Sequence, residues 1–388
     1  MDASQATKAL NISRASLYVY VSRGLIRSTP DPARAKACLY SSADIQALLE
    51  RKKLGRRPRS AVAAALDNGL PILKTRITRI EDNQCFYRSK EAVSFSRKAT
   101  LEDAARLLWD TQEADPFKGL RFDPAKIPGW QETTGMLSPG RTTDRATMQL
   151  SLLTPHEVTR AGRPGPDAFR DAARLLAALT ASIAGTRGVS VGPIHVAVSQ
   201  AWQRPKAADV IRRALVLLAD HELNASTFAA RVVASTGAGL TGCVIAGLAA
   251  MRGPRHGGAT ERLRSLIEEI DAAGDASRVI EARLGRGEPI PGFGNSVYRD
   301  HDPRGAELVS AVKLDPKMSR LLKCARSLAG AEPNVDFGLL AVERTHDLPP
   351  GAALALFALG RSVGWIAHAF EQRSSGALIR PRAEFLPD

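Results

Sequence analysis

The chain has 388 residues, more than one small domain usually holds, and 44% of them are hydrophobic, which is ample for a large core. Aromatic residues make up only 5%, while Ala and Leu abound, so the composition favours helix over sheet. The net charge is +14, and residues 1–60 carry much of it, with twelve Lys or Arg against four Asp or Glu. This asymmetry indicates a polyanionic partner for the N-terminal segment, with a solvated basic surface as the alternative.

The four cysteines are far apart in the sequence and form no metal-type pair. The N-terminus is polar, and the longest apolar runs, 243–251 and 351–360, have the length of buried helices rather than of membrane spans. We therefore expect free thiols, no metal site, no membrane association and a cytoplasmic location.

Residues 3–21 predict two short helices separated by a turn, the first from Ser4 to Leu10 and the second capped by Ser13. This pattern is typical of a helix-turn-helix, whose second helix can lie in the major groove of DNA. A basic loop then leads to Tyr40, and residues 41–53 predict another helix, with Ser42 as its capping candidate.

Residues 3–53 resemble the winged helix-turn-helix of the MerR and excisionase families: helix, turn, helix, an RGLI exit at 23–26, a basic wing and then ADI at 43–45. The resemblance implies DNA binding through residues 1–60, and packing or dimer contacts without DNA are the alternative. We place this module at 1–54, a basic linker at 55–65 and the rest of the chain at 66–388. The DNA-contacting candidates are Arg14, Ser16 and Tyr18 on the second helix and Arg34 and Lys36 on the wing.

Residues 72–88 alternate enough to predict a short hairpin turning at residues 81–83, and Leu101 to Trp109 begins the helical bulk. A histidine between two acids, His221, follows an apolar helix that ends near Leu218. Taken alone, such a group is usually a capped surface cluster.

Two further polar residues carry a chemical signal. His256 precedes two glycines and a helix beginning near Thr260, where the positive helix end would keep the imidazole neutral and able to donate to an oxyanion. Asp336 is flanked by Val335 and Phe337, and burial there would raise its pKa and make it a better base.

The stretch PGFGNSVYRDHDPR at 291–304 contains two glycines that allow unusual backbone conformations or a close approach by a ligand. Asp302-Pro303 predicts a helix start with Arg304 in the first turn. Two arginines at a glycine-rich turn suit a carboxylate or phosphate, and an ordinary surface loop is the alternative.

Together these stretches resemble citrate synthase in order and spacing, over about residues 66–388. The resemblance implies a mainly α, two-domain helical fold with a large and a small subdomain, the small one at roughly 259–345, in a homodimer. A helix-turn-helix module joined to such a domain also looks like a known bacterial subfamily. The matching motifs are DHELNAS at 220–226, HGG at 256–258, PGFG…VYR…DPR at 291–304, VDF at 335–337, GRSVGWIAHAFEQ at 360–372 and IRPR at 379–382.

The resemblance assigns roles residue by residue. Asp336 corresponds to the base that takes a proton from acetyl-CoA, and His256 to the group that stabilises the resulting enol or enolate. Acetyl-CoA and oxaloacetate are the substrates, and no cofactor is implied. The binding candidates are His221, Arg304 and Arg361 for oxaloacetate, Arg380 for the site of the other subunit, and Arg299 with the backbone of Pro291, Gly292 and Gly294 for CoA. Trp365 and His368 fit core positions better than ligands.

One departure bears on catalysis. Asn295 stands where the family has a histidine that polarises the oxaloacetate carbonyl, and Leu218 replaces another frequent histidine. Asparagine can donate a hydrogen bond but cannot transfer a proton, and loss of general-acid help costs about 10²–10⁴-fold. His301 is a possible substitute, although it falls on the far side of the turn.

The leading hypothesis is an acyltransferase that condenses acetyl-CoA, or a related acyl-CoA, with oxaloacetate to give citrate and CoA, the chemistry of the tricarboxylic acid cycle. The alternative is a transcriptional regulator that senses an acyl-CoA or a dicarboxylate through a degenerate citrate synthase domain. A third reading is a partner subunit for an active paralogue.

Overall fold

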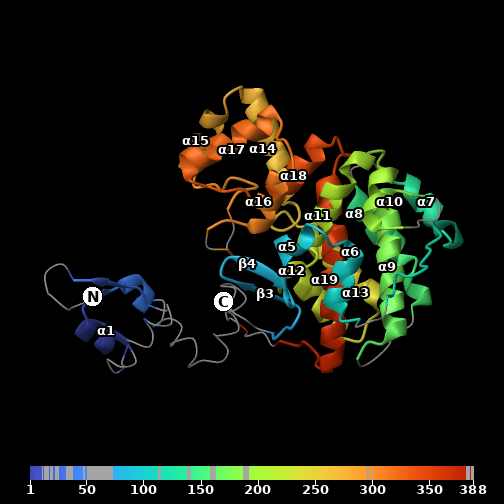
Figure 1. Cartoon of the computed structure of the whole chain (residues 1–388), viewed down its shortest axis with the longest axis horizontal. Helices are drawn as coiled ribbons and strands as arrows, with labels where there is room; N and C mark the ends of the chain where they lie inside the picture. The colour runs from blue at the N-terminus through green and yellow to red at the C-terminus, as the bar shows by residue number, and fades with distance from the viewer. Residues whose placement is uncertain are drawn as a thin grey trace. The chain divides into compact units, whose positions relative to one another are not determined.

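The computed structural model describes residues 1–10, 12, 17, 21, 26–31, 38–46, 49, 73–111, 115–137, 141–157, 163–186, 192–294, 297–298, 300–381 and 385. The chain forms two compact units, Met1–Lys74 and Thr75–Asp388 (Figure 1). The predicted linker at 55–65 lies outside the described residues.

In the first unit, helix α1 (Ala3–Leu10) accompanies an antiparallel hairpin of β1 (Ser28–Pro30) and β2 (Cys38–Tyr40), and residues 42–46 are helical. The cap of that last helix is Ser41, whose Oγ accepts from the Asp44 amide at 3.3 Å, so the prediction of Ser42 was wrong by one residue. The five DNA-contacting candidates lie outside the described residues, and DNA binding stays a prediction. The core of the unit consists of Ala6, Leu10, Leu17, Ile26, Tyr40 and Ile45.

The second unit opens with a small antiparallel sheet of β3 (Thr78–Glu81), β4 (Gln84–Tyr87) and β5 (Lys90–Glu91). Asp82 and Asn83 form the two-residue turn between β3 and β4, with φ of 48° and 63°. Asp and Asn tolerate this left-handed conformation, which matches the twist of the flanking strands. The predicted hairpin is therefore confirmed.

Helices make up the rest of the second unit, and α6 has the bounds predicted for it. They are α5 (Ala92–Ser96), α6 (Leu101–Trp109), η1 (Pro124–Lys126), α7 (Trp130–Gly135), α8 (Thr142–Ser151), η2 (Thr154–His156), α9 (Pro166–Ala184), α10 (Ile194–Ala201), η3 (Pro205–Ala207), α11 (Ala208–Leu218), α12 (Ala225–Ser235), α13 (Leu240–Met251), α14 (Ala259–Ala273), α15 (Ala276–Gly285), α16 (Pro303–Ser310), α17 (Pro316–Ala329), α18 (Val335–Thr345) and α19 (Ala352–Ser375).

Helix α19 runs through the middle of the larger core, among α6, α9, α11, α12 and α13 (Figure 1). It is long and apolar enough to cross a membrane, but 94% of its most apolar window is buried inside the protein, as expected of a core helix. Two glycines let α11 approach it closely. A Cβ on Gly360 would lie 2.7 Å from the Leu218 Cβ, and one on Gly364 would lie 2.5 Å from the Ala219 carbonyl oxygen.

A second hydrophobic core forms among α14, α15, α17 and α18, which gather at one end of the unit (Figure 1). Its members lie within the span predicted for the small subdomain, 259–345. Helix α16 lies at the boundary, because Leu308 belongs to the larger core and Val309 packs against the second one.

Candidate active site

His221 lies just beyond the end of α11, beside the buried Asp220. Its Nε2 is 2.9 Å from the hydroxyl of Tyr298, which comes from the 291–304 stretch. Burial, together with the positive charges of Arg304 and Arg361, lowers the pKa of His221 well below its ordinary value. The imidazole is therefore neutral at physiological pH, and it is part of a cluster rather than a surface group.

Two buried polar side chains, His368 and Arg231, form a hydrogen-bonded series that begins at Asp220. Its Oδ2 is 3.4 Å from His368 Nε2, and His368 Nδ1 is 3.0 Å from Arg231 Nη1. Because arginine can only donate, Nδ1 accepts and Nε2 carries the proton that faces Asp220. Burial alone would raise the pKa of Asp220, but His368 and Arg361 outweigh it and lower that pKa. His368 and Trp365 are fully buried, which confirms that both are core residues.

His256 lies in the loop between α13 and α14, and its Nε2 is 2.8 Å from the Oγ of Ser226. Trp365 Nε1 donates to the same Oγ at 3.1 Å. The Ser226 hydroxyl donates its one proton to Asn224 Oδ1 at 2.8 Å, so its Oγ accepts from the Nε2–H of the neutral imidazole. Burial, with a contribution from Arg361, lowers the pKa of His256 to about 4. The prediction of a neutral His256 agrees with this direction, but the cause is burial rather than the helix end.

Arg304 lies in the first turn of α16 as predicted, but it is 5% exposed rather than solvated. It pairs in a two-pronged manner with the N-cap residue of the helix, Asp302, through Nε to Oδ1 at 3.0 Å and Nη2 to Oδ2 at 2.8 Å. The same carboxylate accepts from the amide of Val335 at 3.1 Å. Asp302 therefore ties the start of α16 to the start of α18, where Asp336 lies.

Asp336 occupies the first turn of α18, which Asn334 caps by accepting from the amides of Asp336 and Phe337. Its Oδ1 is buried and has no hydrogen-bond partner among the residues that the structure describes. Burial raises the pKa of Asp336 to about 7, against the opposing positive charges of Arg304 and Arg262. A carboxyl group with this pKa is poised to exchange a proton near neutral pH.

Arg361 is 1% exposed, and α19 holds it against the end of α11, where its Nε donates to the Leu218 carbonyl at 2.9 Å. Its guanidinium carbon lies 5.1 Å from the centre of the Phe357 ring. Nη2 is buried without a hydrogen-bond partner in the described part of the chain. A buried guanidinium with an open donor is suited to a bound anion.

Residues 65–382 match the family described as "Citrate synthase, C-terminal domain". The chain belongs to the citrate synthase family. It is 37% identical over 200 residues to "Putative citrate synthase 2" of Mycobacterium tuberculosis, and the match covers 48% of this chain and 54% of the relative. It is also 37% identical over 182 residues to a 2-methylcitrate synthase of Shewanella oneidensis, covering 44% and 48%. The matched region thus spans about half the length of these curated relatives.

The fold also matches solved citrate synthases. The enzyme of Thermoplasma acidophilum, solved as a ternary complex with carboxymethyl coenzyme A and oxaloacetate, superposes with a TM-score of 0.69. The two share 23% identity, and the match covers 82% of this chain and 94% of that one. The mainly helical citrate synthase fold predicted for this chain is therefore confirmed.

The 291–304 stretch docks on the segment that precedes α18. The Gly294 amide donates to the Glu332 carbonyl at 3.0 Å, and the Asn334 amide donates to the Gly292 carbonyl at 2.9 Å. Both glycines have positive φ, 82° and 67°, which explains their use here. Asn295, Ser296 and Arg299 lie outside the described residues. His301 is exposed, with its carbonyl bonded to Asn83 of the β3–β4 turn.

A cavity of about 710 Å³ has Pro254 and Gly258, from the loop between α13 and α14, and Pro291 in its lining. Four arginines and three acids also line it, so it is weakly basic. Sequence reasoning missed the arginines because they are scattered singly along the chain, with no motif around them. They are Arg141, Arg252, Arg262 and Arg283.

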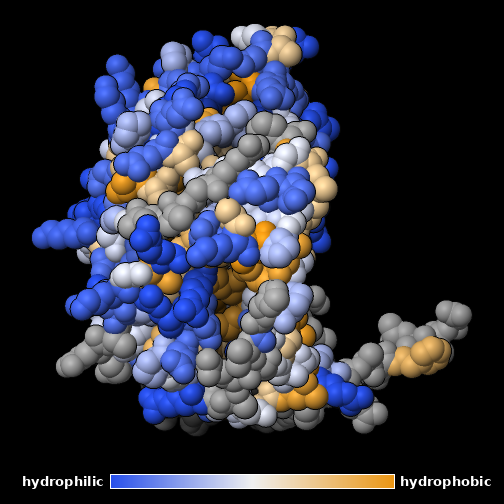
Figure 2. Space-filling view, turned by 90° about the vertical axis from the view of Figure 1, so that its right-hand side faces the viewer, coloured by the Kyte–Doolittle hydropathy of each residue, from blue (hydrophilic) through white to orange (hydrophobic). Residues whose placement is uncertain are grey.

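A larger cavity, of about 800 Å³, has no candidate residue in its described lining, which comes mostly from residues 121–127 and from α9. Figure 2 shows an apolar hollow between hydrophilic side chains on the side of the molecule where α7 and α9 lie in Figure 1.

Arg380 is an exposed residue that follows the end of α19. Among the described residues, no group of His, Cys, Asp or Glu is placed to hold a metal ion, and all four cysteines are free.

Proposed function

We propose that this protein condenses acetyl-CoA, or a related short acyl-CoA, with oxaloacetate and releases CoA. The observation that carries the proposal is that Asp336 has a carboxylate oxygen without a hydrogen-bond partner among the described residues and a pKa raised by burial, while His256 is a neutral imidazole held by Ser226. Removal of a proton next to a thioester requires both a base and a donor to the developing oxyanion. Because one of the relatives is a 2-methylcitrate synthase, the proposal includes acyl-CoA substrates other than acetyl-CoA.

In the proposed reaction, Asp336 takes a proton from the methyl carbon of the thioester, and the neutral imidazole of His256 donates a hydrogen bond to the thioester oxygen. The resulting enol attacks the carbonyl carbon of oxaloacetate and returns its hydroxyl proton to His256 as the thioester carbonyl reforms. The former ketone oxygen takes a proton from water, and a second water hydrolyses the thioester to release CoA. Both substrates enter as reactants, and no cofactor is required. The buried environment of Asp336 and His256 strengthens each of these interactions.

Oxaloacetate would be bound by the cations that already surround His221. Arg361 offers its open Nη2, while Arg304 has two nitrogens occupied by Asp302 and offers Nη1. For CoA we propose the basic cavity at Pro291, together with the nearby backbone of Gly292 and Gly294; Arg299, outside the described residues, stays a predicted phosphate ligand. Its surplus positive charge suits phosphates.

We also propose a homodimer in which Arg380 completes the site of the other subunit. Helix α13 has no charged residue, yet Ile245 and Ala246 are half-buried and Ala249 is exposed in the single chain. A helix that is apolar all round is normally covered, and a second copy of the chain would cover it. Light scattering should give twice the chain mass, and Ile245→Glu should yield monomers.

Asn295 supports a second candidate, in which the domain binds its ligands without efficient turnover and the basic N-terminal unit binds DNA. Release of free CoA from acetyl-CoA and oxaloacetate separates the two. For the enzyme we expect measurable turnover in the wild type, a rise of about 10–100-fold in Asn295→His, and loss of turnover in Asp336→Asn. A wild type without turnover that binds both ligands, and whose residues 1–60 bind DNA in a salt-dependent manner, would establish the regulator instead.

A further inference from the structure

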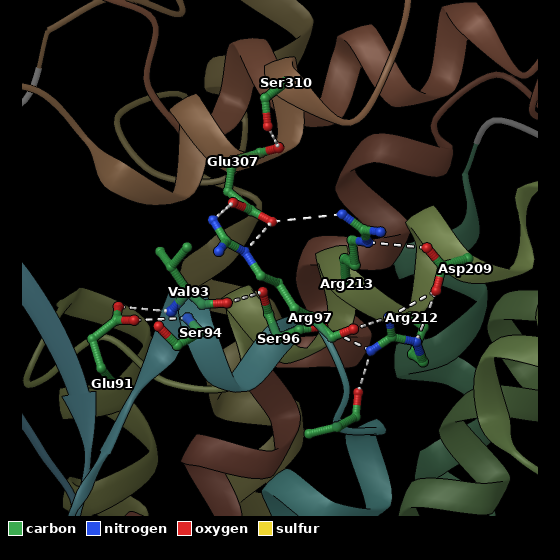
Figure 3. Close-up of polar contacts among 11 residues, drawn as sticks. Glu91, Val93, Ser94, Ser96, Arg97, Asp209, Arg212, Arg213, Glu307 and Ser310 are labelled. Carbon is green, nitrogen blue, oxygen red and sulfur yellow. Dashed lines mark hydrogen bonds and ion pairs between the residues drawn. The ribbon is translucent and has the colours of Figure 1, made fainter.

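Glu307 on α16 is a nearly buried carboxylate, 7% exposed, that receives two arginines from other elements (Figure 3). Arg97 pairs with it through Nε to Oε1 at 3.3 Å and Nη2 to Oε2 at 3.0 Å. Arg213 approaches from α11, with Nη1 3.6 Å from Oε1. We call Arg97, Arg213 and Glu307 the Glu307 cluster.

The position of Arg97 is itself fixed, because it is the C-cap residue of the short helix α5. A five-residue helix has little stability of its own and depends on its caps. Glu91 accepts from the amides of Val93 and Ser94 at the N-terminus, at 2.8 and 2.7 Å. At the other end Arg212 donates to the carbonyls of Ser96, Arg97 and Ala99 at 2.7, 2.9 and 2.6 Å.

One carboxylate, Asp209, holds both arginines of α11. Oδ1 accepts from Arg212 Nη2 at 2.7 Å, and Oδ2 accepts from Arg213 Nε at 3.0 Å. The two side chains are thereby aimed in different directions, Arg212 at the end of α5 and Arg213 at Glu307 (Figure 3). The Glu307 cluster therefore joins α16 to a rigid frame made of α5 and α11.

These elements also carry the proposed dicarboxylate ligands. Arg304 lies three residues before Glu307, one turn earlier on the same face of α16. His221 follows the end of α11, and Arg361 is bonded to the last carbonyl of that helix, that of Leu218. The spacing between Arg304 and the pair of His221 and Arg361 thus depends on how α16 is seated on α11.

We propose that Glu307 is a positioning residue for dicarboxylate binding: through Arg97 and Arg213 it sets Arg304 at the distance from His221 and Arg361 that oxaloacetate requires. This inference rests on the proposed function. Glu307 does not touch the ligand, and it acts only through the seating of α16. The CoA cavity draws none of its described lining from α16 or α5, so its affinity does not depend on the cluster.

Calorimetric titration of the full chain with oxaloacetate, and separately with CoA, tests the proposal. Glu307→Gln keeps the size of the side chain and removes its charge, and we expect it to weaken oxaloacetate binding about tenfold while CoA affinity stays within about twofold. Arg97→Gln should likewise weaken oxaloacetate binding while leaving CoA affinity nearly unchanged. Its side chain is 60% exposed, so this variant folds even if Glu307→Gln does not.

Asp271→Asn is the matched control, because it removes a carboxylate that pairs with Lys317 between α14 and α17, away from the cluster. It should change neither affinity. Unchanged oxaloacetate binding in Glu307→Gln and Arg97→Gln would refute the positioning role alone. An equal loss for both ligands would also refute it, as a sign of general destabilisation. A wild type that binds neither ligand would reject the proposed function, and the inference with it.

Discussion

Asp336→Asn should make the protein more stable at neutral pH, because the buried ionised carboxylate of Asp336 destabilises the folded wild type. The folded-state pKa is about 7, against an ordinary value of 3.8. Below pH 3.8 both the folded and the unfolded states keep the proton, and Asp336 contributes nothing to the pH dependence of stability. Between pH 3.8 and 7 the unfolded state loses its proton while the folded state keeps it, so the free energy of unfolding falls as the pH rises. Above pH 7 both states are ionised and the loss is complete.

The size of the effect follows from the shift. Raising the pKa from 3.8 to about 7 corresponds to about 4 kcal/mol, at 1.36 kcal/mol for each unit. The Asp336 side chain is only partly buried, so solvent reduces this figure, and we take about 2 kcal/mol. Asparagine cannot ionise, so the variant does not undergo this loss of unfolding free energy as the pH rises.

Differential scanning calorimetry of wild type and Asp336→Asn at pH 5 and pH 8 measures this directly. We expect the variant to melt a few degrees higher at pH 8, and the advantage to shrink at pH 5. Turnover should be lost in the same variant at both pH values. An advantage that is equal at the two pH values, or larger at pH 5, would show that Asp336 does not have a raised pKa and would remove the main support for its role as the base.

Two further substitutions test the supports of the site. Ser226→Ala removes the partner of His256 Nε2 and should lower turnover about tenfold with a small change in melting temperature, whereas an unchanged rate would mean that Ser226 does not position the imidazole. Gly364→Ala places a Cβ against Ala219 and Asp220 and should destabilise the chain by about 3 kcal/mol, measured by urea unfolding, whereas wild-type stability would contradict the close packing of α19 on α11.

The sequence allowed good predictions where a local pattern has one physical outcome. Asp302-Pro303 predicted a helix start, and α16 begins at Pro303 with Asp302 as its cap. Glu81-Asp82-Asn83 predicted a turn, and Asp82 and Asn83 adopt the left-handed conformation that a two-residue hairpin loop needs. The ordered motifs of the resemblance covered the region that the family match then confirmed.

What the sequence did not reveal depends on contacts between distant residues. Glu307 and Arg97 are 210 positions apart, and neither belongs to a motif. The hydrogen bond between Tyr298 and His221 and the link from Asp302 to the Val335 amide likewise arise only when the helices pack.

Burial produces opposite pKa shifts at the two proposed reacting groups, and the sign of each shift follows from charge. Burial favours the neutral form of any group, so it raises the pKa of Asp336 and lowers that of His256. A nearby arginine opposes burial at the acid, where it stabilises the carboxylate, but adds to burial at the imidazole, where it repels the imidazolium. At Asp336 burial outweighs Arg304 and Arg262, which leaves a pKa near 7 instead of a much higher value. The two arginines proposed to bind a dicarboxylate thus act on different groups: Arg304 lowers the pKa of Asp336 and so keeps it ionisable, whereas Arg361 lowers the pKa of His256 and so keeps it neutral.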